Sequence, residues 1–349
     1  MKVLLGGDYF YDLSSKRDDF GKIIDSFEKY DLVILNFEGS MRGEDSEITR
    51  KSIRLSVSEE SFRLPNNTIL SLANNHISDF GQGGIRNTIH ELEKNNLKYF
   101  GLTGAINFDE NHLIYEKDGI KICLIGFGWK NEECIPPSEN KAGVLDFNKK
   151  NIDSIFEKIK DLEFDQLIAY IHNGYEFEYY PLPLHVGLSR YLIDKGCDFI
   201  FASHTHCIQP YEIYKDRHIF YGLGNFYFTQ MRNKYPEFCD LGLALEIEID
   251  KTNINVIGAL SVKYNRQDNQ TTISKNKEFL KDEYLPFTDL FSYSRNYKNI
   301  RTRKVNPRPI YFYEADLVNS IKYNLWLAIV KITGFLGIRS YIKKLLGWN

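Results

Sequence analysis

The strongest constraint on the fold is a repeated alternation between short apolar runs and amphipathic helical patterns. Residues 2–7, 31–39 and 68–76 are apolar runs bounded by turn residues, as is typical of buried strands. Residues 20–30 and 83–96 instead have apolar side chains at helical spacing. This alternation predicts an α/β fold, in which helices cover a sheet.

The same alternation continues through the second half of the chain. Asp118 and Gly119 form a turn signal inside residues 112–128, which predicts a β-hairpin. We then expect a helix at residues 152–163, a strand at 166–174, a helix at 184–196 that ends at Gly196, and a strand at 198–206. Consecutive antiparallel strands are expected at residues 211–226 and 241–264.

The sequence changes character after about Asn265, where it becomes polar and rich in tyrosine. We therefore predict a domain at residues 1–265 and a C-terminal extension at residues 266–349. From residue 301 onwards, nine Lys or Arg stand against two acids, and residues 325–348 have apolar side chains at helical spacing. This basic amphipathic helix can contact an anionic membrane surface peripherally or dock on the domain or on a partner subunit.

Composition narrows the compartment and the class of partner. Hydrophobic residues make up 43% of the 349 positions, which is enough for a large core. The five cysteines have no paired spacing, so neither disulfides nor a thiolate zinc site is expected. The N-terminal apolar run is too short for a signal peptide, and we expect a cytoplasmic protein, with possible contact at the inner membrane face. The acidic body argues against nucleic-acid binding.

Polar side chains with metal-binding chemistry follow several predicted strands. They are Asp8, Asn36, Glu38, Asn74, Asn75, His76, His172, His204 and His206. Open α/β sheets place their ligand sites at the carboxyl ends of the strands, so we expect these groups to share one rim. Mixed oxygen and nitrogen ligands suit two divalent ions such as Mn, Zn or Fe. Two such ions a few Å apart can polarise a phosphoryl oxygen and activate water.

Each of these signals has a plainer interpretation when taken alone. A single histidine at a strand end, such as His172, is more often a hydrogen-bonded structural residue. The Gly7-Asp8 pair can form a turn, and Asn74-Asn75 can begin a helix. Only the joint placement at strand ends favours a site.

Two further segments are candidates for substrate binding. Arg54 and Arg63 lie in a loop that leaves the same rim, and they can hold an anionic substrate or simply face solvent. Asn173 and Tyr175 follow His172 and can line a pocket.

Six motifs together resemble the CapA family of capsule and poly-γ-glutamate biosynthesis proteins. They are "GGD", "NFEG", "LANNHISDFG", "IHNGYE", "SHTHCIQPYE" and "YGLGNFYF", in the order of the family, over residues 1–264. The family belongs to the calcineurin-like metallophosphatase superfamily. The resemblance implies a four-layer α/β/β/α sandwich with a dinuclear metal site on the sheet rim.

The resemblance also implies roles for individual residues. Asp8 matches the first metal ligand, Glu38 a bridging carboxylate and Asn75 an amide ligand. His172 and His204 match ligands of one ion, and His206 a ligand of the other. His76 matches the proton donor to the leaving group.

Three positions depart from the pattern that the resemblance implies. Phe10 stands where the superfamily has a metal-binding histidine, and we expect either replacement by Asp12 or a loosely held ion. Ser203 stands in place of glycine, with an effect expected only on the turn. Asn173 replaces a tryptophan, which is expected to alter the substrate pocket.

The function expected from these observations is metal-dependent hydrolysis of a phosphoester in capsule or surface-polymer biosynthesis. The substrate would be an anionic small molecule or a surface polymer. A second hypothesis is amide chemistry on poly-γ-glutamate, or its release, at the same centre. A third is a non-catalytic component that holds a polymer or an assembly partner, with a structural metal.

Overall fold

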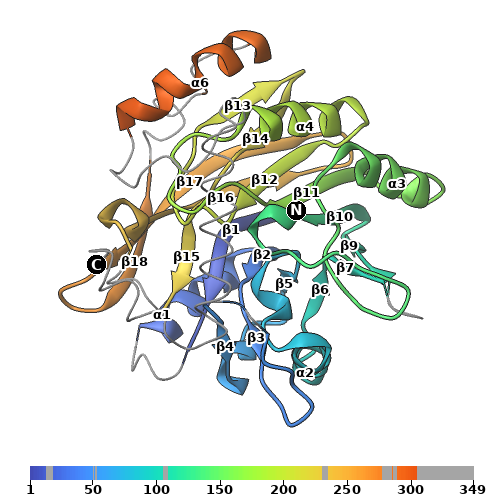
Figure 1. Cartoon of the computed structure of the whole chain (residues 1–349), viewed down its shortest axis with the longest axis vertical. Helices are drawn as coiled ribbons and strands as arrows, with labels where there is room; N and C mark the ends of the chain where they lie inside the picture. Colours follow the sequence, from blue (N-terminus) through green and yellow to red (C-terminus); the bar gives the residue numbers. More distant parts are fainter. Residues whose placement is uncertain are drawn as a thin grey trace, which may run out of the picture.

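Two β-sheets form the centre of the computed structural model and confirm the predicted α/β class (Figure 1). The structure describes residues 1–12, 19–49, 51, 53–104, 109–229, 235–276, 285 and 289–304. The predicted basic helix at residues 325–348 lies outside this part of the chain.

The first sheet has the strand order β18-β17-β16-β1-β2-β5-β6, and β15 also pairs with β1. Its strands are β1 (Lys2–Phe10), β2 (Leu32–Phe37), β5 (Thr68–Ser71), β6 (Lys98–Phe100), β15 (Asn225–Phe228), β16 (Leu241–Ile249), β17 (Ile254–Asn265) and β18 (Gln270–Lys275). The four strands β1, β2, β5 and β6 are parallel, so their carboxyl ends meet at one edge.

The second sheet has the order β13-β14-β12-β11-β10-β9. Its strands are β9 (His112–Lys117), β10 (Ile120–Gly128), β11 (Gln166–His172), β12 (Phe199–Ser203), β13 (Tyr211–Tyr214) and β14 (Arg217–Phe220). Both residues of the β9–β10 turn, Asp118 and Gly119, have positive φ (54° and 72°), as a two-residue hairpin turn requires. This confirms the predicted hairpin.

The alternation of side chains along β10 explains the layering. Ile122 and Leu124 belong to the core cluster that also contains the first sheet. Cys123, Ile125 and Phe127 belong to the cluster under the helices of the second sheet. Because successive side chains of a strand point to opposite faces, β10 is buried on both faces.

The principal helices lie near the predicted positions. They are α1 (Phe20–Asp25), α2 (Gly81–Lys94), α3 (Lys149–Ile159), α4 (Pro183–Asp194) and α6 (Leu290–Lys304), and short 3-10 helices occur in the connections. Helices α3, α4 and α6 lie along the second sheet, and α2 lies on the side of the first (Figure 1). Two sheets between helical layers make the predicted α/β/β/α sandwich.

The prediction of consecutive antiparallel strands at 211–226 is wrong in part. β13 and β14 do form an antiparallel pair, but β15 leaves that sheet and runs parallel to β1. The crossover brings the backbones very close together, because the N–H of Asp8 donates to the carbonyl of Gly224 at 3.0 Å. A Cβ on Gly7 would lie 1.9 Å from that carbonyl oxygen, so this position requires glycine.

The described part of the predicted extension packs against the body. β18 pairs with β17, and the Tyr293 hydroxyl of α6 donates to the carbonyl of Pro181 at 2.6 Å. The division at residues 265 and 266 remains a prediction. Among the described residues, no helix is both long and apolar enough to cross a membrane.

Candidate metal centre

The carboxyl ends of parallel strands from both sheets meet at one buried site. Asp8 on β1 pairs in register with Asn36 on β2, and His172 on β11 pairs with Ser203 on β12. Because the two sheets pack face to face, these pairs lie opposite each other. The Ser203 hydroxyl donates across the interface to Asp8 Oδ1.

Two groups of potential metal ligands lie at this site. The His172 group contains Glu38, His172 and His204, and the His206 group contains Asp8, Glu38 and His206. Within each group, one ligand atom of every residue lies within 4.8 Å of the others, and all of these residues are buried. Glu38 belongs to both groups, which is the position of a bridging carboxylate.

Glu38 has the environment of a buried metal ligand. Its side chain is fully buried, and neither carboxylate oxygen has a hydrogen-bond partner within the described structure. Burial and the neighbouring Asp8 raise the pKa of Glu38 well above its ordinary value. A buried carboxylate with two unsatisfied oxygens is costly unless a cation or donor compensates it. The donor set therefore fits divalent ions that accept oxygen and nitrogen ligands.

The ligand atoms of the His172 group converge at distances suited to one ion. His172 Nε2 lies 2.9 Å from Asn75 Oδ1 and 3.1 Å from His204 Nδ1. Ligands bonded at about 2.0–2.1 Å to a common ion lie about 3 Å apart, so these separations fit coordination. Burial, followed by the effect of His204, lowers the pKa of His172 well below its ordinary value. The imidazole is therefore neutral, the form that binds metals.

The His206 group is organised around Asp8. Asp8 Oδ1 accepts from Asn36 Nδ2 at 2.8 Å, and Oδ2 accepts from the backbone N–H of His204 at 3.2 Å. Asp8 Oδ2 also lies 3.6 Å from His206 Nδ1. The side-chain oxygen of Asn225 lies 2.9 Å from the same nitrogen, so Nδ1–H can donate to it and Nε2 then faces Glu38 at 3.9 Å.

Ser203 does more than shape the turn, and the expectation that it affects only the turn is wrong. Its hydroxyl contacts Asp8 Oδ1 and also lies 2.5 Å from the hydroxyl of Tyr170. Tyr170 in turn lies 2.9 Å from His172 Nδ1. A hydroxyl at this position thus links the two groups, a contact that glycine cannot make.

Phe10 and Asp12 lie near the end of β1. The Phe10 side chain is fully buried and packs against Phe228, with ring centroids 5.2 Å apart. Asp12 belongs to neither group, and its backbone N–H donates to the Thr229 hydroxyl at 2.8 Å. Replacement of the missing histidine by Asp12 and a loosely held ion therefore both remain predictions.

His76 forms a dyad with Asp79 beside the two groups. His76 Nδ1 lies 2.7 Å from Asp79 Oδ2, and His76 Nε2 lies 3.8 Å from Glu38 Oε1. Lys51 Nζ lies 3.0 Å from Asp79 Oδ1 and also contacts the carbonyl of Asn75. Burial raises the pKa of Asp79, but His76 and Lys51 outweigh it and hold that pKa below its ordinary value. Asp79 is therefore an anion that orients His76.

The backbone at His204 and His206 is unusual. Their φ angles are +100° and +56°, in a region that residues other than glycine rarely adopt. Such conformations cost about 1–3 kcal/mol each and concentrate at functional sites. They direct both imidazoles toward Glu38 from one short turn.

Of the four predicted substrate-binding residues, the two arginines are exposed, whereas Asn173 and Tyr175 contact residues of the protein. Arg54 is exposed and donates to backbone carbonyls of its own loop, and Arg63 is exposed beside Glu60. Tyr175 packs edge-on against Trp129, with ring centroids 5.1 Å apart. The Asn173 N–H donates to the Ser203 carbonyl at 3.2 Å. Their roles remain predictions. Among the described residues of this loop, Lys51 is the cation that contacts the site.

Several residues at the centre were not predicted from the sequence. They are Asp79, Glu132, Tyr170 and Asn225. Asp79 and Asn225 lie inside the motifs "LANNHISDFG" and "YGLGNFYF", which offered a signal. Glu132 and Tyr170 lie in no such motif, and only the folded structure brings them to the site.

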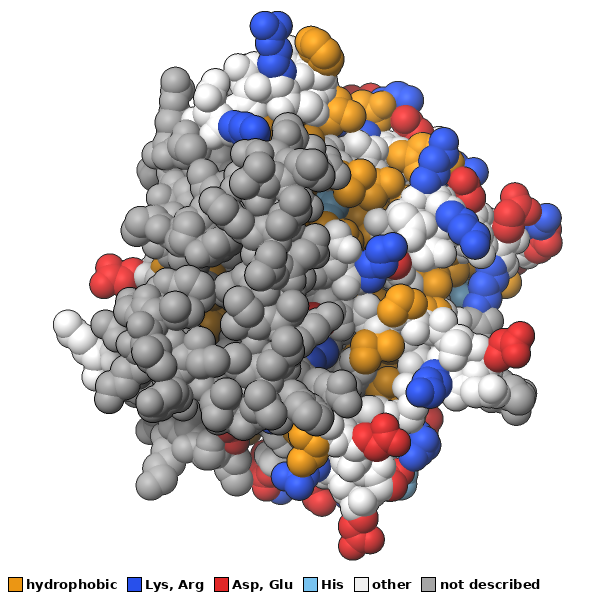
Figure 2. All heavy atoms as spheres, viewed as in Figure 1, with side chains coloured by type: hydrophobic (Ala, Val, Ile, Leu, Met, Phe, Trp, Pro, Cys, Tyr) orange, Lys and Arg blue, Asp and Glu red, His pale blue; other side chains and the backbone are white. Residues whose placement is uncertain are grey.

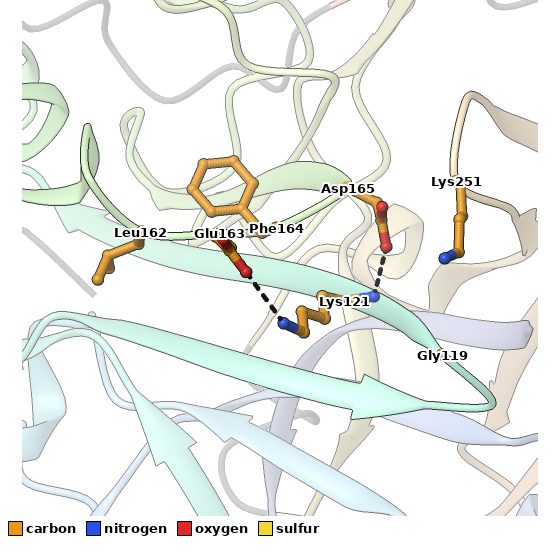
Figure 3. Close-up of a pocket in the computed structure, with 7 residues that line it drawn as sticks. All are labelled: Gly119, Lys121, Leu162, Glu163, Phe164, Asp165 and Lys251. Atoms are coloured by element: carbon orange, nitrogen blue, oxygen red, sulfur yellow. Dashed lines mark hydrogen bonds and ion pairs between the residues drawn. The ribbon is translucent and has the colours of Figure 1, made fainter.

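A surface hollow of about 320 Å³ lies away from this centre (Figure 3). It is bordered by Lys121, Asp165 and Lys251, at the start of β10 and β11 and at the β16–β17 turn. His172 lies at the other end of β11. The hollow and the metal centre are thus at opposite ends of the second sheet.

Fold and site together define a two-sheet α/β protein with a buried candidate centre for divalent metals. Residues 3–230 match the family described as bacterial capsule synthesis protein PGA_cap. The chain belongs to this family.

Two curated relatives carry capsule-related names. The capsule biosynthesis protein CapA of Bacillus anthracis is 31% identical over 211 residues, covering 57% of this chain and 51% of the relative. The PGA biosynthesis protein CapA of Bacillus subtilis (strain 168) is 30% identical over 209 residues, covering 58% and 55%. The chain thus spans about half the length of these relatives.

Among solved structures, a hypothetical protein from Thermus thermophilus is similar, with a TM-score of 0.47 and 14% identity. The similarity covers 79% of this chain and 100% of that structure.

Proposed function

We propose that this protein is a metal-dependent phosphoesterase that acts in the biosynthesis of a capsule or another surface polymer. The observation that carries the proposal is Glu38, which is shared by two ligand groups and has two buried carboxylate oxygens without partners among the described residues. A carboxylate in this position is suited to two ions held side by side. The family membership supports the biological setting.

The residues present can hold two divalent ions, of Mn, Zn or Fe. Glu38, Asn75, His172 and His204 would hold one, and Asp8, Glu38 and His206 the other. When bound, such ions supply Lewis acidity, which polarises a phosphoryl oxygen and lowers the pKa of water. Phe10 leaves the His206 group with one imidazole fewer than the superfamily pattern, so we expect its ion to be the weaker of the two.

His76 is the proposed proton donor to the leaving oxygen. Its Nδ1–H donates to Asp79, so Nε2 is the nitrogen that faces the centre. The Asp79 carboxylate fixes the orientation of the ring, so that Nε2 can pass a proton to an oxygen that is gaining negative charge. Lys51 and the backbone N–H of Leu55 hold Asp79 in place.

The proposed substrate is an anionic phosphoester of a small molecule or of a surface polymer. Lys51 is the buried cation beside the dyad, with only 7% of its side chain exposed. On the face shown in Figure 2, acidic and basic side chains are interspersed among the coloured residues. We assign recognition of an anion to the centre because Lys51 lies there.

Phosphate release from generic and sugar phosphates, with metal-free protein and added Mn²⁺, tests the proposal. We expect release that depends on Mn²⁺ and is lost in His76→Ala. A protein that binds two ions but releases no phosphate from any of these esters would contradict phosphoesterase activity. Cleavage of poly-γ-glutamate in that situation would support amide chemistry at the same centre.

A further inference from the structure

In the candidate ligands His172, His204 and His206, one ring nitrogen faces another ligand of its own group, and the second nitrogen can be held by an outer hydrogen-bond partner. His172 Nδ1 faces the Tyr170 hydroxyl at 2.9 Å. His206 Nδ1 faces the Asn225 side-chain oxygen at 2.9 Å. These contacts orient the imidazoles, as outer hydrogen bonds do at metal sites.

The outward nitrogen of His204 is different. His204 Nδ1 is directed inward, 3.1 Å from His172 Nε2, so Nε2 is the outward atom. This nitrogen is buried and has no hydrogen-bond partner within the described structure. The nearby carboxylate oxygen Glu132 Oε2 lies 3.6 Å away. This distance is slightly too long for a hydrogen bond, and a small side-chain movement would close it.

Glu132 is held over the centre by the packing of its own segment. It lies in a 3-10 helix at Lys130–Glu132, directly after β10. The residues on either side, Trp129 and Cys134, are buried, and the Lys130 N–H donates to Asp146 Oδ1 at 2.9 Å. The Glu132 side chain is 23% exposed and faces His204. Its backbone is thus fixed, while its carboxylate has room to move.

We propose that Glu132 is a positioning residue, whose carboxylate accepts the Nε2–H of His204 and thereby keeps Nδ1 free to bind the ion of the His172 group. The inference rests on the metal centre of the proposed function. Without Glu132, the buried Nε2–H has no acceptor, so the tautomer that presents Nδ1 to the ion loses stability. The affinity for that ion then falls.

Calorimetric titration of metal-free protein with Mn²⁺ tests this role. We expect Glu132→Ala to weaken binding of one of the two ions by about 10- to 100-fold and to leave the other unchanged. Glu132→Gln retains an acceptor oxygen and should recover part of the lost affinity. Glu133→Ala is the matched control, because Glu133 is the adjacent, exposed carboxylate, and it should bind as the wild type does.

A second readout separates positioning from folding. When Glu132→Ala is titrated with Co²⁺, the visible absorption spectrum of one bound ion should differ from that in the wild type, and the spectrum of the other ion should not. The unfolding temperature of the metal-free variant should equal that of the wild type. Normal binding of both ions by Glu132→Ala would overturn the inference and leave the centre intact. Equal weakening of both ions with a lower unfolding temperature would also overturn it. A wild-type protein that binds no ion would overturn both the inference and the proposed centre.

Discussion

Replacement of Glu38 by glutamine should stabilise the metal-free protein and, at the same time, remove its response to metal. The two effects have opposite signs because the buried carboxylate destabilises the metal-free protein but is the proposed ligand when ions are bound. Both of its oxygens are buried and have no partner among the described residues. Glutamine has nearly the same shape but carries no charge.

The size of the stabilisation follows from the pKa of Glu38, which burial and Asp8 raise above 4.5. A raised pKa in the folded state means that the folded protein binds the carboxyl proton more tightly than the unfolded chain does. Stability is therefore greatest below the unfolded pKa and is lost as the pH rises through the folded pKa. At about pH 7.5 the free energy of unfolding has fallen by at most about 4 kcal/mol, because about 3 pH units separate this pH from the ordinary carboxyl pKa and each unit contributes about 1.36 kcal/mol. Glu38→Gln removes this loss, which corresponds to an increase of up to about 8 °C in unfolding temperature.

Thermal unfolding after treatment with EDTA, at several values of pH, measures this difference. We expect the variant and the wild type to converge near pH 4.5, the ordinary pKa of the carboxyl, and to diverge as the pH rises. Addition of Mn²⁺ at about 100 times its Kd should stabilise the wild type by about 2.7 kcal/mol or more and the variant far less. A metal-free variant that is less stable than the wild type at about pH 7.5 would refute the reasoning, as would an undiminished response to Mn²⁺.

Three further predictions follow from the same structure. His76→Ala should lower kcat for a phosphoester about 10²- to 10⁴-fold without changing the metal content; reduced metal content would contradict its role as proton donor. Burial lowers the pKa of His172 and His206, so at these two groups the unfolded state binds more protons. Below about pH 6.5 each should lower the free energy of unfolding by up to about 1.4 kcal/mol per pH unit, and His204, whose pKa is raised, offsets one of the two. Urea unfolding of metal-free Glu38→Gln, which lacks the opposing contribution of Glu38, measures this loss, and a flat profile would contradict it. Lys51→Met should lower the free energy of unfolding, measured in urea, by about 3–5 kcal/mol, because it leaves Asp79 without its buried cation. The control Lys130→Met replaces a side chain that is 61% exposed and should change the free energy of unfolding by less than about 1 kcal/mol. Equal effects of the two substitutions would contradict the assignment of Lys51 as the buried partner of Asp79.

Most of the fold could be predicted because its signals are local. The β9–β10 hairpin depends on two adjacent residues, Asp118 and Gly119, and strand β10 depends on a continuous apolar run. The crossing of β15 to the first sheet has no such signal. It depends on the close approach of Gly7 to Gly224, residues far apart in the chain.

The same distinction applies to the candidate centre. Asp8, Glu38 and His172 could be proposed because each follows a recognisable strand. Ser203 could not be assigned its contact with Asp8, since the two residues are 195 positions apart and meet only when the sheets pack. Glu132 lies on a short 3-10 helix whose position depends on buried neighbours rather than on any sequence pattern.

The proposal that two ions share Glu38 predicts that the two ions interact. Electron paramagnetic resonance of metal-free protein loaded with two equivalents of Mn²⁺ tests it most directly. The structure predicts the spectrum of an exchange-coupled pair, which reverts to that of isolated Mn²⁺ in Glu38→Gln. A wild-type protein that shows only isolated Mn²⁺ after binding two equivalents would contradict the shared carboxylate.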